Sequence, residues 1–396
     1  MIDHHYMRDG TLAIPTGLIL FYAKIVFIDL LSIPTKCHPP NNQMKTIRSQ
    51  KPIDKNICSM TLKMEVIKVF SFALMIVISV FLVESARAKD SGFKLMMTPK
   101  WTGFPYFELA AKGGKAAADE LGDRFTYAGA DHADPTLQVE TLQNFLTQRP
   151  DGIILAAIDL NAVAPVLKEA RKRGIVVTAF DADAAVPARD MFCNQMSYEQ
   201  AAKTMLDCAL LDAPEGGEVA FVAASPTAPN HTAHIKYMTE FIKNDPKYQV
   251  FKVVDTQYAQ DDDSKSYDVA VNLMQAHPDL RVIISSSAVS APAGARAIVA
   301  SGKAGKVFST GFALPNAIKS YIQDGSEKAF ALWDPYELGY IATYVTHLKL
   351  AGKLEVKPGV TFQAGKAGQY TIGKDGEIVY GKPLIFTKET IDKFNF

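Results

Sequence analysis

The chain has 396 residues, of which 48% are hydrophobic and 21% are charged, a composition typical of a globular protein with room for two domains and a large core. Lys and Arg together number 42, as do Asp and Glu, so the formal net charge is zero. No broad basic field is available to hold phosphate backbones, which argues against a nucleic-acid partner.

The amino-terminal part of the chain differs from the rest. Residues 1–59 mix a broken apolar run with Pro and polar residues and show no sustained period, so we expect a disordered or non-native leader there. Residues 60–88 combine two Lys, a charge-free run at 69–83 and a small-residue exit, Glu-Ser-Ala-Arg-Ala. This pattern predicts a secretory signal peptide cleaved after Ala88, which places the mature chain in the periplasm.

A signal peptide inside a chain makes little physical sense, so we expect translation to begin at Met60 or Met64. If Met1 is used instead, an uncleaved anchor is the competing interpretation. The mature part keeps only Cys193 and Cys208, the first in a predicted buried strand and the second on the following helix. Two buried thiols are expected there, with a disulfide as the alternative.

Beyond residue 92, short apolar runs alternate with segments of helical period, which predicts βαβα units around parallel sheets. In the first half the expected strands are 93–98, 124–128, 152–158, 175–180 and 191–195, with helices at 108–121, 135–148 and 162–173. The alternation begins again with expected strands 218–224, 251–258, 282–286, 307–312 and 328–333 and helices 198–211, 231–242, 264–275, 292–300 and 316–323. A long helix, 336–350, and strand-like pieces at 369–372 and 377–380 follow.

This repeated alternation predicts an α/β fold of two Rossmann-like lobes with parallel sheets of similar size. No long Gly/Ser-rich linker separates the two sets, so the lobes should face each other across a central cleft. We expect lobe 1 to comprise residues 89–195 and 336–384, and lobe 2 to comprise residues 196–335 and 385–396.

The first strand-to-helix loop, 98–107, reads Thr-Pro-Lys-Trp-Thr-Gly-Phe-Pro-Tyr-Phe. Open parallel sheets bind ligands at such loops, and aromatic faces can grip a ring while polar groups bond its hydroxyls. A hydrophobic staple into the following helix is the alternative interpretation of the same aromatics. The candidate ligand-binding residues here are Lys100, Trp101, Tyr106 and Phe107, while Phe104 has no assigned role.

The predicted strand at 175–180 leads into Phe-Asp-Ala-Asp, which supplies Asp181 and Asp183. Side chains two residues apart in an extended chain point to the same side, so both carboxylates can accept hydrogen bonds from one ligand. A solvated strand end is the alternative. The pattern also resembles the Asp-x-Asp nucleophile motif of haloacid-dehalogenase-like phosphatases, but Ala185 replaces the Thr of that motif, and the strand is the fourth rather than the first.

A second candidate site follows the predicted strand 218–224, where Ser-Pro-Thr-Ala-Pro-Asn-His opens a helix. Asn230 could point into the cleft, and His231 could donate or accept a hydrogen bond. Helix capping alone would also account for Asn230. His234 lies nearby, but no Cys or acidic partner stands at metal-ligand spacing, so no metal site is predicted.

Two more strand ends carry candidates. The small residues of 285–294, with Pro292 and Gly294, let a ligand approach the backbone or allow tight packing of a helix on a sheet. Trp333 and Asp334 end another strand, where the indole could wall a sugar pocket or fill a gap between the lobes.

No cofactor motif is present in the sequence: it has no P-loop, no Gly-x-Gly-x-x-Gly after a strand, no Gly-x-Ser-x-Gly elbow and no His-Glu-x-x-His. The acidic run 261–263 lacks the later Gly and Glu of a calcium loop and predicts a solvated turn. We therefore expect neither an enzyme nor a cofactor.

Taken together, the strand-end motifs make residues 93–396 resemble the periplasmic solute-binding proteins of type I fold that serve sugar ABC importers. Within that group the chain is most similar to the rhamnose-binding and Lsr-type autoinducer-2-binding proteins. The motifs are the first loop, Phe-Asp-Ala-Asp, Ser-Pro-Thr, Ala-Leu-Trp-Asp-Pro-Tyr-Glu-Leu-Gly and the closing Phe-Thr-Lys-Glu-Thr-Ile-Asp-Lys-Phe-Asn-Phe. A transcription regulator with this core would need a DNA-binding helix pair where the export segment stands.

The resemblance implies a protein that binds without chemistry. Two lobes hinge closed on a small sugar-like ligand, and a membrane ABC permease recognises the closed form. A chemoreceptor is a further candidate partner, and a monomer is expected.

The resemblance also implies roles for single residues. In the autoinducer-2 receptors the ligand is held by the first-loop Lys, the first Asp of Asp-x-Asp, an Asp-Gln pair after Ser-Pro-Thr, and backbone near a Pro-Ala-Ala turn. The positions that match are Lys100, Asp181 and Pro292, with Lys100 as the expected partner of Asp181. Asn230 and His231 replace the Asp-Gln pair, and Gly294 replaces the second Ala. A mismatched buried polar group costs about 1–3 kcal/mol, so a deoxyhexose such as rhamnose is at least as well indicated as autoinducer-2.

Overall fold

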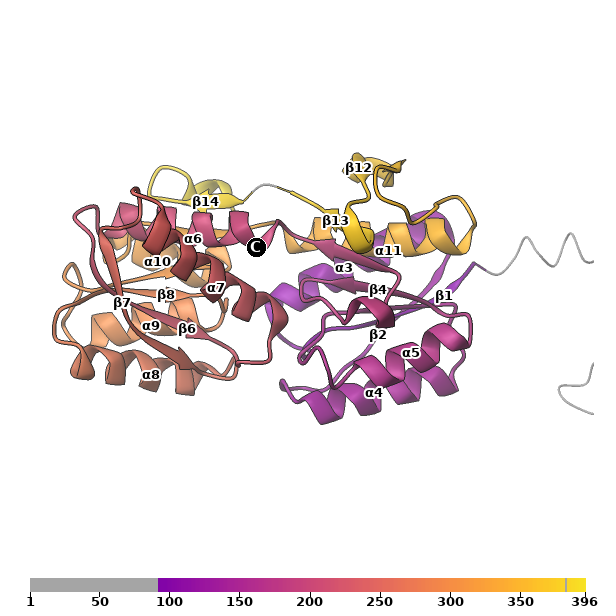
Figure 1. The fold of residues 1–396 in the computed structure, drawn as a ribbon, viewed down its shortest axis with the longest axis horizontal. Helices are drawn as coiled ribbons and strands as arrows, with labels where there is room; N and C mark the ends of the chain where they lie inside the picture. The colour runs from indigo at the N-terminus through magenta and orange to yellow at the C-terminus, as the bar shows by residue number, and fades with distance from the viewer. Residues whose placement is uncertain (1–91, 382) are drawn as a thin grey trace, which may run out of the picture. The chain divides into compact units, whose positions relative to one another are not determined.

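The computed structural model describes residues 92–381 and 383–396, all of which fall within one compact unit of the chain. The predicted leader, 1–59, and the predicted signal peptide, 60–88, lie outside the described residues. Among the residues described, no helix combines the length and the apolar character that crossing a membrane requires. Two sheets with flanking helices make up the fold (Figure 1).

The larger sheet has six parallel strands in the order β13-β5-β4-β3-β1-β2. These strands are β1 (Lys94–Thr98), β2 (Arg124–Tyr127), β3 (Gly152–Leu155), β4 (Val176–Phe180), β5 (Met191–Asn194) and β13 (Glu377–Val379). Its helices are α3 (Pro105–Leu121), α4 (Pro135–Thr147), α5 (Ala164–Lys172) and α11 (Pro335–Leu350). Helices α3 and α11 cover one face of the sheet, and α4 and α5 cover the other (Figure 1).

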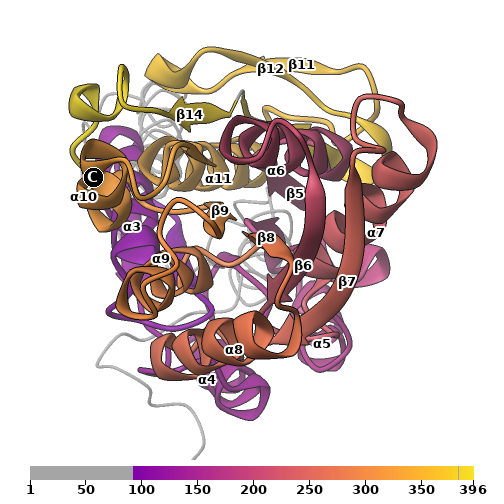
Figure 2. The same cartoon turned by 90° about the vertical axis from the view of Figure 1, so that its left-hand side faces the viewer.

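The smaller sheet has four parallel strands in the order β7-β6-β8-β9. They are β6 (Gly217–Ala223), β7 (Phe251–Tyr258), β8 (Leu280–Ser285) and β9 (Phe308–Gly311). The helices of this part are α6 (Tyr198–Asp212), α7 (Pro229–Asn244), α8 (Asp263–Ala276), α9 (Ser290–Ala300) and α10 (Pro315–Asp324). Figure 2 shows α6 and α7 on one face of this sheet and α8 and α9 on the other.

The carboxyl-terminal segments explain why the two sheets differ in size, which the sequence pattern did not predict. Strand β13 adds to the edge of β5 in the larger sheet. Strand β10 (Phe330–Leu332) instead pairs antiparallel with β14 (Leu384–Phe386), and one bridge, Phe312 to Ala331, links it to the β9 end. Both pairings join segments far apart in the chain, so no local period signals them.

The remaining elements are short. Strands β11 (Thr361–Gln363) and β12 (Gln369–Thr371) form an antiparallel pair, and the 3-10 helices are η1 (Val186–Ala188), η2 (Gly365–Ala367), η3 (Lys374–Gly376) and η4 (Ile391–Lys393). The chain passes from the larger sheet to the smaller between β5 and α6, returns between β10 and α11, and crosses again between β13 and β14. The last crossing lies a few residues ahead of the boundary predicted after residue 384.

Helices α3 and α11, which cover one face of the larger sheet, pack closely against each other. A Cβ at Gly113 of α3 would lie 1.8 Å from the carbonyl oxygen of Tyr336, and one at Gly339 of α11 would lie 1.9 Å from that of Ala110. Only glycine allows the two backbones to come this close. The amino-terminal halves of α3 and α11 are therefore held together; Tyr106 lies in the first turn of α3, and Trp333 lies two residues before α11.

Both cysteines of the predicted mature chain are buried. Cys193 lies on β5 and Cys208 on α6, and each is a free thiol, as expected from the sequence. Burial raises the pKa of both thiols, so they stay protonated and unreactive.

Candidate functional site

The loops that follow the carboxyl ends of strands from both sheets enclose a pocket of about 430 Å³, including its open mouth. Parallel α/β sheets bind ligands at this edge. The larger-sheet side contributes Lys100, Trp101, Phe104, Tyr106, Phe107 and Asp181. The smaller-sheet side contributes Asn230, His231, His234, Asp261, Ser286, Ser287, Ala288, Val289, Phe312, Leu332 and Trp333.

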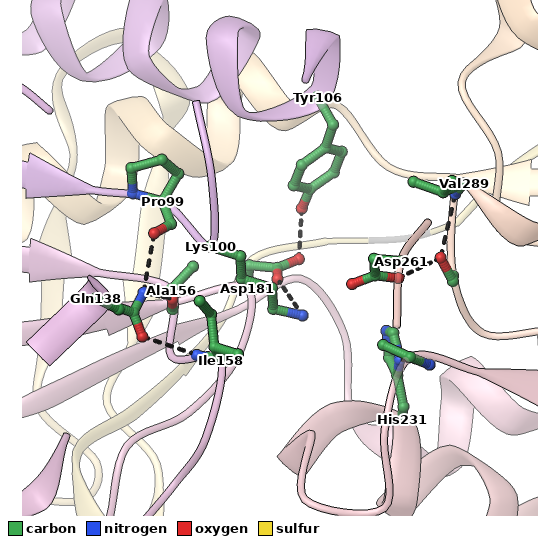
Figure 3. Close-up of polar contacts among 12 residues, drawn as sticks. Pro99, Lys100, Tyr106, Gln138, Ala156, Ile158, Asp181, His231, Asp261 and Val289 are labelled. Atoms are coloured by element: carbon green, nitrogen blue, oxygen red, sulfur yellow. Dashed lines mark hydrogen bonds and ion pairs between the residues drawn. The ribbon is translucent and has the colours of Figure 1, made fainter. Parts of the chain in front are cut away.

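Asp181 is the centre of the larger-sheet side of the pocket. Its Oδ2 lies 3.6 Å from Lys100 Nζ, and both side chains are more than nine-tenths buried. Its Oδ1 accepts a hydrogen bond of 2.8 Å from the Tyr106 hydroxyl (Figure 3). The predicted pairing of Lys100 with Asp181 is therefore present in the structure. Burial raises the pKa of Asp181, and the charge of Lys100 works against this rise.

A second contact connects this group to the crossover between the lobes. Trp333 Nε1 donates a 2.8 Å hydrogen bond to the Tyr106 hydroxyl, which itself donates to Asp181. Trp333 directly follows β10, and Tyr106 is the second residue of α3, so the chain of bonds links the crossover after β10 to the larger-sheet side of the pocket. Burial and the nearby carboxylate of Asp181 raise the pKa of Tyr106, which keeps its proton as a donor.

Asp183 does not line the pocket. Both of its carboxylate oxygens accept hydrogen bonds from Arg189, Oδ1 from Nε at 2.5 Å and Oδ2 from Nη2 at 2.8 Å. Arg189 also donates to the Asp375 carbonyl. The expectation that both carboxylates face one ligand assumed an extended chain. Asp181 instead has a φ of 61°, in the left-handed region, which ends the strand alternation and turns the two side chains apart. With Asp183 held by Arg189, the second carboxylate of an Asp-x-Asp phosphohydrolase is also not at the site.

Aromatic rings form the wall beside Lys100. Trp101 stacks on Phe104 with ring centroids 5.1 Å apart, and Phe107 meets Trp101 edge to face at 5.5 Å. Across the pocket, Phe312 lies edge to face with Trp333 at 4.9 Å. Trp101, Tyr106, Phe107 and Trp333 thus lie where the sequence predicts, and Phe104 joins them.

On the other side of the pocket, α7 begins one residue before Asn230, at Pro229, and its N-cap position is Ala228. The alternative interpretation of Asn230 as a cap therefore does not hold. Its side chain is buried, and Oδ1 has no hydrogen-bond partner within residues 92–381 and 383–396. A buried acceptor of this kind costs free energy until a ligand or water satisfies it.

Two histidines lie beside Asn230. His231 Nδ1 accepts a 3.0 Å hydrogen bond from the backbone N–H of Ala224, so a neutral ring carries its proton on Nε2. His234 lies next to it, with ring centroids 6.3 Å apart, and neither of its nitrogens has a partner in the described part of the chain. Burial lowers the pKa of both rings, and the positive charge of Lys100 lowers them further. Both imidazoles are therefore neutral at physiological pH.

The acidic run 261–263 was predicted to be a solvated turn, but its three Asp side chains lie in three different environments, and one of them lines the pocket. Asp263 is exposed and pairs with Arg296 at 2.7 Å, and Asp262 caps α8 by accepting from the Lys265 N–H. Asp261 instead lines the pocket, where Ser287 Oγ donates to its Oδ1. The rule that ligands bind at carboxyl ends of strands could have found Asp261, because it lies three residues after β7.

The remaining predicted residues lie outside the pocket lining. Helix α9 begins at Ser290, two residues before the predicted start, which places Pro292 and Gly294 inside the helix. A Cβ at Gly294 would meet Ser309 Oγ at 2.7 Å, so packing of the helix on its sheet explains this glycine. Asp334 caps α11 by accepting from the Tyr336 N–H at 2.8 Å.

The pocket as a whole suits a small, neutral and polar ligand. Lys100 faces two carboxylates, Asp181 and Asp261, and the histidines are uncharged. Aromatic rings line the same pocket as polar side-chain atoms that have no partner among the described residues. No cluster of three His, Cys, Asp or Glu residues that could hold a metal ion occurs in the described ranges.

Comparison with known proteins gives one family. Residues 95–354 match the family described as a periplasmic binding protein domain. The D-allose-binding periplasmic protein of Escherichia coli is 28% identical over 281 residues, which cover 68% of this chain and 86% of that protein.

Two solved structures are similar over nearly their whole length. A sugar ABC transporter structure from Actinomyces odontolyticus is 39% identical, with a TM-score of 0.64, and the match covers 76% of this chain and 97% of that one. A solute-binding protein from Clostridium phytofermentas with bound L-rhamnose is 28% identical, with a TM-score of 0.73, and the match covers 77% and 98%. The proteins named in these matches are binding and transport proteins.

Proposed function

Because the chain belongs to the periplasmic binding protein family, we propose that it is the substrate-binding component of an ABC importer, with a small neutral sugar as its ligand. One observation carries the proposal: a pocket between strand ends of both sheets combines stacked aromatic rings with buried polar atoms that lack partners among the described residues. Hydroxyl groups on a ring that is apolar on its faces would satisfy both features. The D-allose-binding and L-rhamnose-bound relatives support the same ligand class.

A deoxyhexose of the rhamnose type is the ligand that we propose within this class. Such a sugar carries a methyl group in place of the hydroxymethyl group of a hexose, and the pocket offers it Val289, Phe312 and Leu332 as apolar contacts. Autoinducer-2 is the alternative, because Lys100 and Asp181 stand at the positions that its receptors use. Asn230 argues against autoinducer-2 as the ligand, because this neutral side chain stands where those receptors have an anionic acceptor.

The proposed mechanism is binding without chemistry. Contacts from both lobes stabilise a closed form by their differential affinity, and the membrane permease recognises that form. A chemoreceptor that reads the same closed surface is a further candidate partner. Cleavage after Ala88 would release the mature chain into the periplasm as a monomer.

Fluorescence offers a direct test, because both tryptophans of the chain, Trp101 and Trp333, line the pocket. The purified protein is titrated with L-rhamnose, D-allose, D-ribose and autoinducer-2 while tryptophan emission is followed. We expect a saturable change with at least one neutral sugar and the tightest binding for L-rhamnose. No change with any of the four, in protein first unfolded and refolded to remove bound ligand, would contradict the proposal.

A further inference from the structure

The smaller-sheet side of the pocket carries a carboxylate that neither the sequence motifs nor the resemblance assigns to a ligand. We propose that Asp261 is a ligand-binding residue that selects neutral, hydroxyl-rich sugars against acidic ones, working together with Asn230 and His231. This inference rests on the proposed function, since it names what the sugar must present to the pocket.

The position of Asp261 is fixed by its own loop. Gln260 N–H donates to the Ala224 carbonyl at 2.8 Å, which fastens the end of β7 to the end of β6. Gln260 and Asp261 have φ values of 57° and 52°, both in the left-handed region, so the chain turns sharply at this point. The turn brings the carboxylate to the pocket, while Asp262 goes on to cap α8.

The two oxygens of Asp261 differ in their surroundings. Oδ1 accepts from Ser287 Oγ, on the loop after β8. The other oxygen lies on the side that faces Lys100 and Asp181 of the larger-sheet wall (Figure 3). Asp261 therefore has one oxygen that orients it and one that remains for a ligand hydroxyl.

Charge then decides what kind of ligand the pocket accepts. The Lys100 ammonium acts on both Asp181 and Asp261, and it is the single side-chain cation among the described lining residues. His231 and His234 stay neutral and add no positive charge. At a pH above the raised pKa values of Asp181 and Asp261, an anionic sugar meets two carboxylates and the single positive charge of Lys100, whereas a hydroxyl donates to a carboxylate without charge repulsion.

Asn230 and His231 complete a pattern next to Asp261. Asn230 Oδ1 is a buried acceptor with no partner among residues 92–381 and 383–396, and His231 is fixed as a donor at Nε2 by its bond to Ala224. This wall thus offers two acceptors, the Asp261 carboxylate and Asn230 Oδ1, and two donor groups, the Asn230 amide and His231 Nε2. A sugar with neighbouring hydroxyls can bond to acceptors and donors alike, while a carboxylate or phosphate can bond only to the donors.

The test compares Asp261→Asn with Asp263→Asn, a matched control in the same acidic run whose carboxylate is exposed and pairs with Arg296. Dissociation constants are measured by calorimetry for L-rhamnose and D-allose as neutral probes and for D-galacturonate and D-glucuronate as acidic probes. We expect Asp261→Asn to weaken binding of the neutral sugar roughly 10- to 100-fold and to narrow its preference over the acidic sugars. Asp263→Asn should stay within about twofold of the natural protein.

Ser287→Ala gives a second variant that keeps the carboxylate but removes its anchor, and we expect it to weaken binding about 3- to 10-fold. Melting temperatures show whether each variant folds. Equal affinities for Asp261→Asn and Asp263→Asn would overturn the inference, as would an unchanged affinity in Ser287→Ala if Asp261→Asn fails to fold. A natural protein that binds none of the four sugars would instead count against the proposed function.

Discussion

The two walls of the pocket differ in how far their polar groups are satisfied. On the larger-sheet wall, Lys100, Tyr106 and Asp181 are joined to one another, and Trp333 donates into the same group. On the smaller-sheet wall, Asn230 Oδ1 and both ring nitrogens of His234 have no partner in the part of the chain that the structure describes. Each wall lies at strand ends of a parallel sheet, so their folds do not explain the difference.

This difference indicates that the two walls contribute to ligand binding in different ways. The polar groups of the larger-sheet wall hold one another in place, which lowers the entropy lost on binding. The smaller-sheet wall holds unpaired groups that a ligand would satisfy, which is a source of specificity, because a ligand without the matching hydroxyls leaves them unpaired. Changes in the first wall should therefore affect all ligands, and changes in the second should affect the choice among them.

Replacing Asp181 should have the largest effect. Asp181→Ala removes the carboxylate that joins Tyr106 and Lys100 and leaves the Lys100 ammonium buried without its partner. We expect binding of every sugar to weaken by roughly 100-fold or more, about 3 kcal/mol. Calorimetric titration measures this loss, and retained affinity would remove Asp181 from the site.

Acidification should act next, through the carboxylates rather than the histidines. Burial raises the pKa of Asp181 and Asp261, so the acceptors are lost as the pH falls through values above the usual carboxyl pKa of about 4. The pKa values of His231 and His234 are lowered, so both rings stay neutral as the pH passes about 6.5.

Affinity measured from pH 8 to pH 4 should therefore be flat near neutrality and then fall. The Asp261→Asn variant should show a shallower fall, because it has one titrating acceptor fewer. A break centred near pH 6.5 that disappears in His231→Gln would show that an imidazole controls binding and would contradict this account.

Loss of the Tyr106 hydroxyl should have a moderate effect on all ligands. Tyr106→Phe removes the donor to Asp181 and leaves Trp333 Nε1 without its acceptor. We expect roughly tenfold weaker binding, about 1.4 kcal/mol, from the loss of one buried hydrogen bond to a charged group. Tyr380→Phe is the matched control, since its hydroxyl also donates to a carboxylate, Glu337, away from the pocket. Similar losses in both variants would indicate a general effect of the missing hydroxyl.

Asp183 should separate stability from binding. Asp183→Asn weakens the contact with Arg189, whose side chain is only 3% exposed, and we expect the free energy of unfolding to fall by about 3 kcal/mol. The dissociation constant should change by less than about twofold, because the side chain does not line the pocket. Denaturant unfolding and sugar titration of the same variant give both numbers. A large loss of affinity in a folded variant would show that Asp183 does contribute to ligand binding.

The larger-sheet wall, most of which comes from one continuous loop, was easier to predict from the sequence than the smaller-sheet wall, which comes from several separate loops. Lys100, Trp101, Tyr106 and Phe107 lie in one loop, so their joint arrival at the pocket follows from the position of that loop after β1. Asn230 and His231 also line the pocket, because they lie in the first turn of the helix after β6.

What the sequence could not give depends on backbone conformation and on pairing between distant segments. The left-handed φ of Asp181 turns Asp183 away, and no residue pattern signals it. The early start of α9 moves Pro292 and Gly294 into a helix. In the sequence, Asp261 cannot be distinguished from an exposed acidic residue. In the structure, the turn after β7 places it beside Ser287. The difference in sheet size arises from β13 and β14, which pair with strands far back in the chain.

We propose that the hydroxyls of a neutral sugar satisfy the unpaired groups of the smaller-sheet wall. Calorimetry of the purified protein with L-rhamnose and D-allose, each compared with D-galacturonate and D-glucuronate, is the decisive measurement. We expect one site per chain, saturable binding of at least one neutral sugar, and affinity for the acidic sugars at least about tenfold weaker. Equal or tighter binding of an acidic sugar would show that these groups do not select neutral sugars.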